Sequence, residues 1–162
     1  MKAAAIRRYK QPVAIVDLPK PSPGPGDLLV KMRAASVNPV DFKIRDGGVK
    51  ALIRYSFPLI LGNDLAGEVE AVGEGVTRFR PGDAIYARLD KHRIGAFAEY
   101  ALVSEGAAAA KPKNLDWAES ASLPLVGLTA WQALIDLGGL KPAQKVLIHG
   151  GAGTRRDRKS VV

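Results

Sequence analysis

The clearest chemical signal in the sequence is a glycine-rich turn near its end. Residues 145–153 read KVLIHGGAG, a short apolar run that breaks into Gly150, Gly151 and Gly153. A buried parallel strand that opens into closely spaced glycines is typical of a loop whose backbone N–H groups hold a dinucleotide phosphate. We therefore predict that Gly150, Gly151 and Gly153 bind a nucleotide cofactor.

The rest of that fingerprint is incomplete. Arg156 stands where a third glycine would allow a helix to pack closely on the strand. The residue about 20 positions further on, which distinguishes NAD from NADP, has no counterpart because the sequence stops at Val162. Only a few residues follow Lys145, whereas one strand–helix–strand unit needs about 30. We expect only the first strand of a truncated dinucleotide-binding domain.

Other chemistries are excluded by residue types. The sequence has no cysteine, so disulfides, thiolate catalysis and cysteine metal sites are ruled out. Its two histidines, His92 and His149, lie far apart in the sequence and cannot form a paired-histidine zinc site. We interpret His92, in the polar stretch ARLDKHRIGAFAEY, as exposed; alternatively it lies at the rim of the cleft as a titratable group.

Composition favours a soluble globular protein rather than a disordered one. The 162 residues are 47% hydrophobic and 25% charged, and no apolar run approaches the length of a membrane span. The net charge of +8 is spread thinly outside a basic end, with no basic cluster interleaved with aromatics. We therefore predict no nucleic acid and no membrane as partners. The N-terminus lacks the apolar core of a secretory signal, from which we predict a cytoplasmic protein.

The first 110 residues predict short strands separated by turns. Strand-like runs cover 2–7, 13–18, 27–37, 64–72, 84–87 and 96–103. Gly67 inside its run suggests a bulge or a close backbone approach. Pro39 and Gly47 suit the beginning and end of a short helix. This part is predicted to be a small barrel.

The pattern turns helical after Lys111. Asn114 or Asp116 is the expected helix N-cap, and Glu119 follows Asp116 by three residues, as in a capping box. Apolar residues then recur at helical spacing up to Leu137, where Gly138 and Gly139 predict the end of the helix. Trp131 has the spacing of a core residue, and we interpret it as packing.

Five stretches together resemble a known family in order and spacing. They are ASVNPVDFKIRDG, FPLILGNDLAGEVEAVGEGVTRFRPGDAIYA, GAFAEYALV, ASLPLVGLTAWQAL and KVLIHGGAG. The sequence from Met1 to about Gly153 is similar to the zinc-free quinone oxidoreductase and enone reductase branch of the medium-chain dehydrogenases.

This resemblance implies a mainly β fold with some α. Residues 1–112 would be a GroES-like catalytic (substrate) domain, 113–143 a connecting helical segment, and 144–153 the start of a Rossmann cofactor domain. It further implies that the parent enzyme binds NADPH in the cleft between domains. It would reduce quinones or α,β-unsaturated carbonyls by hydride transfer, and it would form a homodimer through the Rossmann sheet.

The resemblance also addresses zinc. Zinc-dependent relatives have ligands at positions that correspond to Asn38, Asn63, Asp64 and Leu125. Asp64 is the only strong ligand among these four, and one carboxylate cannot hold a site that needs three or four ligands. We predict no zinc, so that a substrate carbonyl would be polarised by hydrogen bonds.

Three candidate catalytic residues lie in the first of these stretches. By its position Asn38 would face the cleft and donate to a substrate carbonyl or to the nicotinamide ribose; alternatively it only starts the turn before Pro39. Asp41 would orient neighbouring donors, or complement the helix dipole. Lys43 lies where some quinone reductases have a Tyr, and would stabilise an enolate or be solvated.

Asn63 and Asp64 are the other catalytic candidates, as remnants of the metal site that bond the backbone near the cleft, or as a structural turn. Thr129 matches a threonine that contacts the nicotinamide, although a helical threonine also bonds its own backbone.

The alternative to an active enzyme half is a non-catalytic GroES-like fragment or partner-binding module. The ending DRKSVV resembles a translated sequencing adaptor, so we interpret 154–162 as a probable non-native tail.

Overall fold

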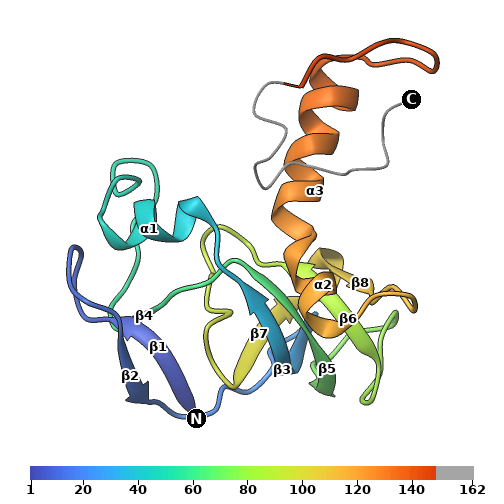
Figure 1. The fold of residues 1–162 in the computed structure, drawn as a ribbon. Coiled ribbons are helices and arrows are strands. Elements are labelled where there is room, and N and C mark those ends of the chain that lie inside the picture. The colour runs from blue at the N-terminus through green and yellow to red at the C-terminus, as the bar shows by residue number, and fades with distance from the viewer. Residues whose placement is uncertain (149–162) are drawn as a thin grey trace.

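The barrel is built from two antiparallel sheets. A computed structural model describes residues 1–148, and Figure 1 draws 149–162 as a grey trace. The strand order is β2–β1–β4 in one sheet and β7–β3–β5–β6–β8 in the other. The strands are β1 (Lys2–Ile6), β2 (Ala14–Asp17), β3 (Asp27–Ser36), β4 (Leu59–Ile60), β5 (Asp64–Val72), β6 (Ala84–Arg88), β7 (Tyr100–Ser104) and β8 (Ala108–Ala110). The predicted mainly β fold with some α is confirmed.

Each sheet buries its own apolar cluster. The larger cluster lies on the five-stranded sheet around Leu28, Val30, Leu65 and Ile85, all of which are fully buried. The smaller joins Ile6 of β1 to Ile44 of the first helix. The backbone N–H of Ala4 donates to the carbonyl of Phe97 at 2.7 Å, which connects β1 to the chain that enters β7. This hydrogen bond joins the two sheets.

Gly67 lies at a close approach of backbones in the longest strand pair, β3 with β5. The register of β3 against β5 shifts between Met32 and Ala34, opposite Gly67. A Cβ atom at Gly67 would lie 2.5 Å from the carbonyl oxygen of Lys31 and 2.6 Å from Cγ1 of Val30. The predicted bulge or close approach is confirmed, and only a glycine fits there.

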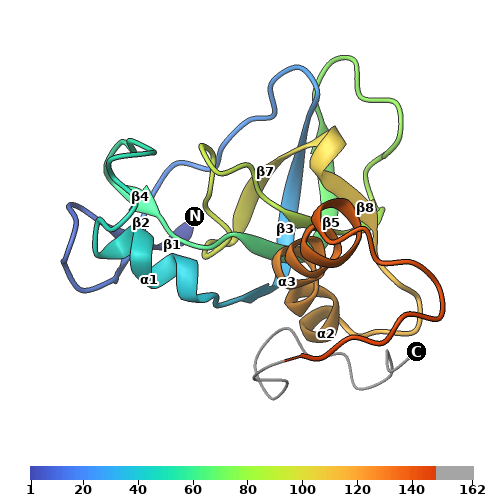
Figure 2. The same ribbon diagram turned by 90° about the horizontal axis from the view of Figure 1, so that it is seen from above.

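In residues 1–148 three α-helices lie around the sheets. Figure 2 shows α2 and α3 together beside the five-stranded sheet. Helix α1 (Pro39–Arg45) begins at Pro39, and Gly47 follows it with φ +75°. Helix α2 (Trp117–Ser122) has the predicted capping box, in which Asp116 Oδ1 accepts from Glu119 N at 2.7 Å and Glu119 Oε2 accepts from Asp116 N at 2.9 Å. The predicted helix starts are confirmed.

Helix α3 (Pro124–Trp131) continues into a π-helical segment, η2 (Gln132–Leu137), which ends at Gly138. Together they stand out from the sheets (Figure 1). A short 3-10 turn, η1 (Glu105–Ala107), precedes β8. Trp131 is 60% exposed and Leu137 is 87% exposed. The packing role predicted for Trp131 is therefore wrong within the described residues, because helical spacing identifies a face but not what covers it.

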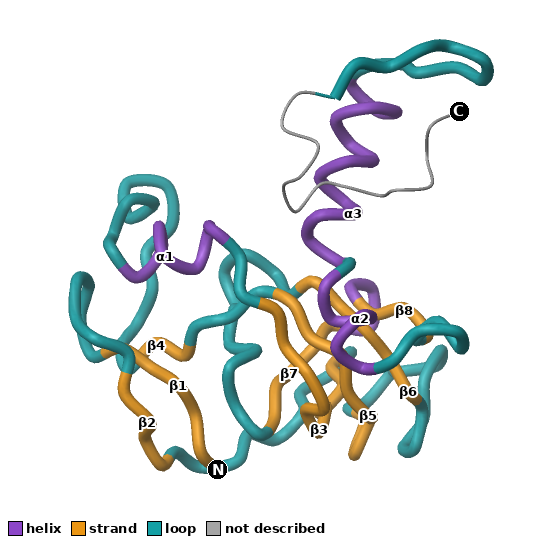
Figure 3. Tube along the Cα trace, viewed as in Figure 1, coloured by secondary structure: helices purple, strands orange, loops and turns teal. Residues whose placement is uncertain are grey.

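Residues 145–148 do not form the strand that we predicted. They follow a turn as irregular chain with exposed side chains, shown as loop in Figure 3. A parallel strand needs a neighbour to accept and donate its backbone hydrogen bonds, and an apolar run has no reason to be extended without one. Within 1–148, no helix has both the length and the apolar character that crossing a membrane demands.

Candidate functional site

The site centres on Asp64, the first residue of β5. Its side chain is fully buried. Oδ2 accepts hydrogen bonds from Asn38 Nδ2 at 3.0 Å and from Ser36 Oγ at 3.2 Å. The backbone N–H of Leu125, in the first turn of α3, donates to both carboxylate oxygens at 3.1 and 3.2 Å. One carboxylate thus connects β3, β5 and α3.

A second buried carboxylate, Asp41, lies in the first turn of α1. Its Oδ2 accepts from the backbone N–H of Asn38 at 2.7 Å, and its Oδ1 accepts from Asn63 Nδ2, also at 2.7 Å. Asp41 therefore caps its own helix and holds the loop before β5. Asn38 contacts both carboxylates, one through its backbone and one through its side chain. We call Ser36, Asn38, Asp41, Asn63 and Asp64 the buried polar cluster.

Burial sets the electrostatics of this cluster. Desolvation raises the pKa of Asp64 above its ordinary value, and the Asp41 charge adds to the rise, while hydrogen bonds from Asn38, Leu125 and Ser36 oppose it. Desolvation likewise raises the pKa of Asp41, against hydrogen bonds from Asn38 and Asn63. Among the described residues every buried polar side-chain atom has a partner. The cluster is therefore a satisfied network rather than a set of unused groups.

The side chain of Asn38 has less to offer a substrate than its sequence position suggested. Its amide nitrogen donates to Asp64 Oδ2 and, at 3.3 Å, to Ser36 Oγ, which uses both amide hydrogens. A new donor bond to a substrate carbonyl would require one of these bonds to break. Asn38 is also 4% exposed.

Ser36 is the member that the sequence analysis missed. The antiparallel register places Ser36 directly opposite Asp64, so the pairing of the two strand-like runs was the signal that could have found it. The Leu125 N–H carries no side-chain signal at all. It depends on where α3 begins.

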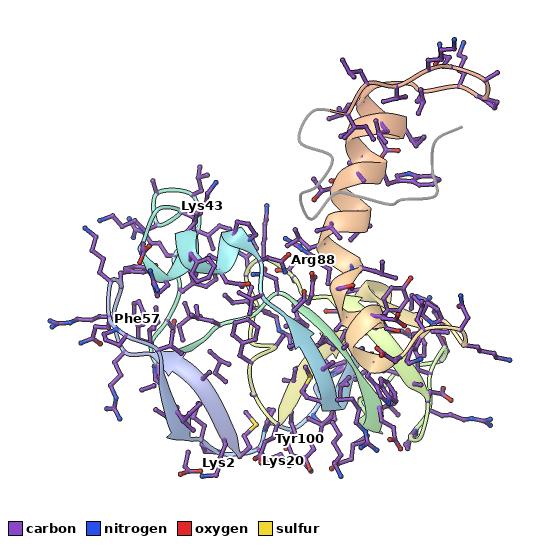
Figure 4. All side chains as sticks on the ribbon, viewed as in Figure 1. Lys2, Lys20, Lys43, Phe57, Arg88 and Tyr100 are labelled. Carbon is purple, nitrogen blue, oxygen red and sulfur yellow. The ribbon has the colours of Figure 1, made fainter. Side chains whose placement is uncertain are left out.

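Lys43 does not join the cluster. It lies on the outer side of α1, exposed, and Figure 4 shows it at the far side of that helix from the sheets. Asp41 and Ile44 face inward from the same helix. The alternative interpretation of Lys43, as a solvated side chain, agrees with this placement. His92 is likewise exposed.

Thr129 lies one helical turn beyond Leu125 on α3, half-buried. Its Oγ1 donates to the carbonyl of Leu125 at 2.7 Å, the backbone bond that the sequence left open as an alternative. The predicted phosphate-binding residues Gly150, Gly151 and Gly153 lie outside the described residues, as does the tail 154–162. Across 1–148 no three His, Cys, Asp or Glu side chains come together as a metal site would require.

Comparison with known proteins matches this architecture. Residues 24–113 match the family model of the alcohol dehydrogenase GroES-like domain. An alcohol dehydrogenase superfamily protein from Novosphingobium aromaticivorans has a TM-score of 0.89 and 39% identity, over 96% of this chain and 47% of that one. A mycobacterial protein, Rv1454c, solved in complex with NADPH, has a TM-score of 0.83 and 33% identity, over 94% and 46%.

Sequence relatives agree. The chloroplastic quinone-oxidoreductase QR1 of Triphysaria versicolor is 39% identical over 143 residues, which are 85% of this chain and 44% of the relative. The human mitochondrial NAD(P)H oxidoreductase RTN4IP1 is 39% identical over 145 residues, 80% of this chain and 37% of the relative. The chain spans less than half the length of these relatives.

These relatives also correct one prediction. A cytoplasmic location is contradicted, because the similar proteins include chloroplastic ones from Triphysaria versicolor and Spinacia oleracea and a mitochondrial one from Danio rerio. Our prediction relied on the lack of the apolar core of a secretory signal, which bears only on secretion. It does not distinguish the cytosol from an organelle.

The family model covers more than half of the chain, and its boundaries enclose the second sheet together with α1. The quinone oxidoreductase from Coxiella burnetii adds a further structural match, with a TM-score of 0.82 and 33% identity. The chain thus belongs to the alcohol dehydrogenase GroES-like domain family, on the quinone oxidoreductase side of the medium-chain dehydrogenases, and corresponds to the N-terminal part of such proteins.

Proposed function

We propose that the whole protein is an NADPH-dependent oxidoreductase that reduces quinones or α,β-unsaturated carbonyls, and that this chain supplies the substrate-side half. Residues 1–112 form the substrate domain, 113–143 connect it onward, and 144–153 begin the cofactor domain. The nicotinamide supplies the hydride when it is bound. The names of the similar quinone and NAD(P)H oxidoreductases, and the NADPH complex of the mycobacterial neighbour, support this proposal.

The observation that carries the proposal is the bond between Asp64 and the first turn of α3. It fixes the helix that holds Thr129 to the end of the barrel that holds Asn38. Thr129 lies about 6 Å along the helix axis from Leu125, since each residue rises 1.5 Å. A nicotinamide contacting Thr129 would lie beside the buried polar cluster. Gly150, Gly151 and Gly153 would hold its phosphates.

The chemistry of the cluster supports a reaction without zinc. The side-chain amide N–H of Asn38 donates to Asp64. The Asp64 oxygens also accept hydrogen bonds from the Ser36 hydroxyl and the Leu125 backbone N–H. A cation would need oxygen or nitrogen lone pairs in these places. The residues present therefore do not fit a metal ion, and positioning and hydrogen bonding are the contributions left to the protein.

The proposed roles differ among the cluster residues. Asp64 and Asp41 orient Asn38 and Asn63 by accepting their hydrogens. Asn38 and Asn63 lie buried beneath the end of the barrel from which a substrate carbonyl would approach α3, and they hold the backbone there in position. Lys43 is exposed on the outer side of α1. It contributes only if the cofactor half of the proposed protein brings the substrate to that side.

The test joins this chain to a second half. Residues 1–148 are continued into the second half of the NADPH-bound mycobacterial relative, and NADPH oxidation is followed with a small quinone and a small enone, with a chelator present. We expect turnover by the hybrid and none by purified 1–162. Replacing Asn38 by Leu should lower turnover at least tenfold, whereas the exposed control Lys113→Gln should not. A hybrid that melts cooperatively and binds NADPH but reduces neither substrate would overturn the proposal, as would a requirement for zinc.

A further inference from the structure

The positive charge of the described part is concentrated in one place. Residues 7–10 and 42–57, which we call the basic lobe, contain seven Lys or Arg and one Asp. The remainder of 1–148 contains 13 basic and 14 acidic residues. In the sequence the positive charge looks thinly spread, because residues 7–10 and 42–57 are more than 30 residues apart. The fold brings them together.

Three contacts join the two segments. The backbone N–H of Lys10 donates to the carbonyl of Arg45 at 2.8 Å. The rings of Tyr9 and Phe57 meet edge to face with centroids 5.0 Å apart. Gly47 lies against Tyr9, so closely that a Cβ atom would be 3.2 Å from the ring. The basic lobe is one surface, at the end of the molecule that carries α1 (Figures 1 and 4).

The charges of the lobe face solvent. Arg7, Arg8, Lys10, Lys43, Lys50 and Arg54 are all exposed, and Arg45 is the member that forms an ion pair within the described residues, with Asp46 at 2.8 Å. A surface with this excess of unneutralised cations attracts polyanions. Charge alone does not say which polyanion.

The apolar side chains of the lobe decide between partners. Leu52 is 86% exposed and lies between Lys50 and Arg54 in the sequence, in the segment that follows α1. Phe42, within α1, is 51% exposed, and Phe57 is 38% exposed. Single-stranded nucleic acid binds cations and aromatic stacking surfaces, and a duplex accepts a leucine only as a wedge that unstacks its bases at a cost. A bilayer takes both, with cations at its headgroups and Leu or Phe in the acyl boundary.

We infer that the basic lobe docks on an anionic lipid bilayer. Clusters of 4–8 Lys and Arg are typical of such peripheral contacts. Because Asn38 caps the start of α1 and the same helix carries Lys43 and Arg45 of the lobe, docking would hold the buried polar cluster close to the membrane surface. The inference rests on the lobe alone and does not depend on the proposed reaction.

The experiment is sedimentation of purified 1–162 with vesicles of phosphatidylcholine alone or mixed with phosphatidylglycerol. We expect binding only to the anionic vesicles, weakened by salt. The variant Arg8→Gln, Lys50→Gln, Arg54→Gln should bind on the order of a hundredfold more weakly, about fivefold for each charge. Leu52→Ser should weaken binding about tenfold, because an inserted leucine is lost.

Two controls have matched charge changes. The variant Lys2→Gln, Lys31→Gln, Lys113→Gln removes three exposed cations outside the lobe, and a second variant makes Arg155, Arg156 and Arg158 glutamine. Both should keep at least a fifth of the wild-type affinity. The inference is overturned if the controls lose as much binding as the lobe variant, if Leu52→Ser binds like wild type, or if the chain prefers duplex DNA to anionic vesicles at equal salt.

Discussion

Asp64 shows how much depends on one side chain. Three donors from three elements end on its carboxylate, and solvent does not reach it. Buried donors that lose their acceptor keep the full cost of their desolvation. The residue is therefore expected to matter for stability as well as for the position of α3.

Replacing Asp64 by Ala should lower the free energy of unfolding by at least about 2 kcal/mol, because the side chains of Asn38 and Ser36 and the N–H of Leu125 lose their acceptor. Urea denaturation of 1–162 measures the change. Asp46→Ala, at an exposed pair with Arg45, is the control and should cost at most about 1 kcal/mol. Equal effects of the two substitutions would contradict the role assigned to Asp64.

The buried carboxyls also predict a pH dependence. Burial raises the pKa of both Asp41 and Asp64, so between their ordinary value near 4 and the raised native value the folded state binds more protons than the unfolded state. Their contribution to stability therefore falls as pH rises through this window. Unfolding free energies of wild type and of Asp41→Asn, Asp64→Asn, measured across that window, should converge or cross in favour of the variant at higher pH. A difference that does not change with pH would contradict this.

At the residue scale the sequence predicted which residues lie together but not which hydrogen bonds join them. Asn38, Asp41, Asn63 and Asp64 do lie together, since the resemblance placed them at the same end of the barrel. Lys43 could not be separated from them by sequence spacing, because its direction depends on which face of a short helix is buried. Ser36 required the strand register, and the Leu125 N–H required the start of α3.

At the scale of elements, local signals were the reliable ones. The capping box at Asp116, the start of α1 at Pro39 and the bulge at Gly67 each depend on a few neighbouring residues, and the structure has them all. Residues 145–148 failed as a strand because strand formation depends on a partner that the described chain does not supply.

Gly67 permits a direct test of the bulge. Gly67→Ala should lower the free energy of unfolding by about 1–3 kcal/mol or more, because its Cβ would meet the Lys31 carbonyl at 2.5 Å and that backbone cannot move freely within a sheet. Gly106→Ala is the control, since nothing lies within 4 Å of its Cβ, and should stay within about 0.5 kcal/mol. Thermal or urea unfolding checks both, and a Gly67→Ala protein as stable as the control would refute the close approach.

At the scale of the whole molecule, the helix formed by α3 and η2 has no covering surface within residues 1–148. The chain spans 37–50% of the relatives cited above, and α3 and η2 expose Leu128, Trp131 and Leu137. The sequence showed a periodic apolar face there, but periodicity cannot say whether the covering surface belongs to the same chain. The basic lobe was missed for the converse reason, since its segments are adjacent only after folding.

Exposed apolar surface of this kind favours self-association. We expect the sedimenting mass of 1–162 to rise with concentration, and Trp131→Gln, Leu137→Gln to weaken association at least tenfold, because each apolar side chain kept from water contributes about 1.5–3 kcal/mol. Leu52→Gln, which is as exposed as Leu137 but lies in the basic lobe, should leave association unchanged. If Leu52→Gln abolishes association while the helix variant does not, the helix is not the contact surface.

The bond between Asp64 and Leu125 makes α3 and η2 a lever with its pivot inside the barrel. The arm from Pro124 to Leu137 is about 20 Å long at 1.5 Å per residue. A ten-degree error at the pivot would move Thr129 by only about 1 Å but the far end by about 3–4 Å. In the reaction that we propose, a misplacement of about 1 Å would slow the transfer. The angle at the Asp64 carboxylate would then decide how accurately the proposed substrate domain meets a cofactor domain.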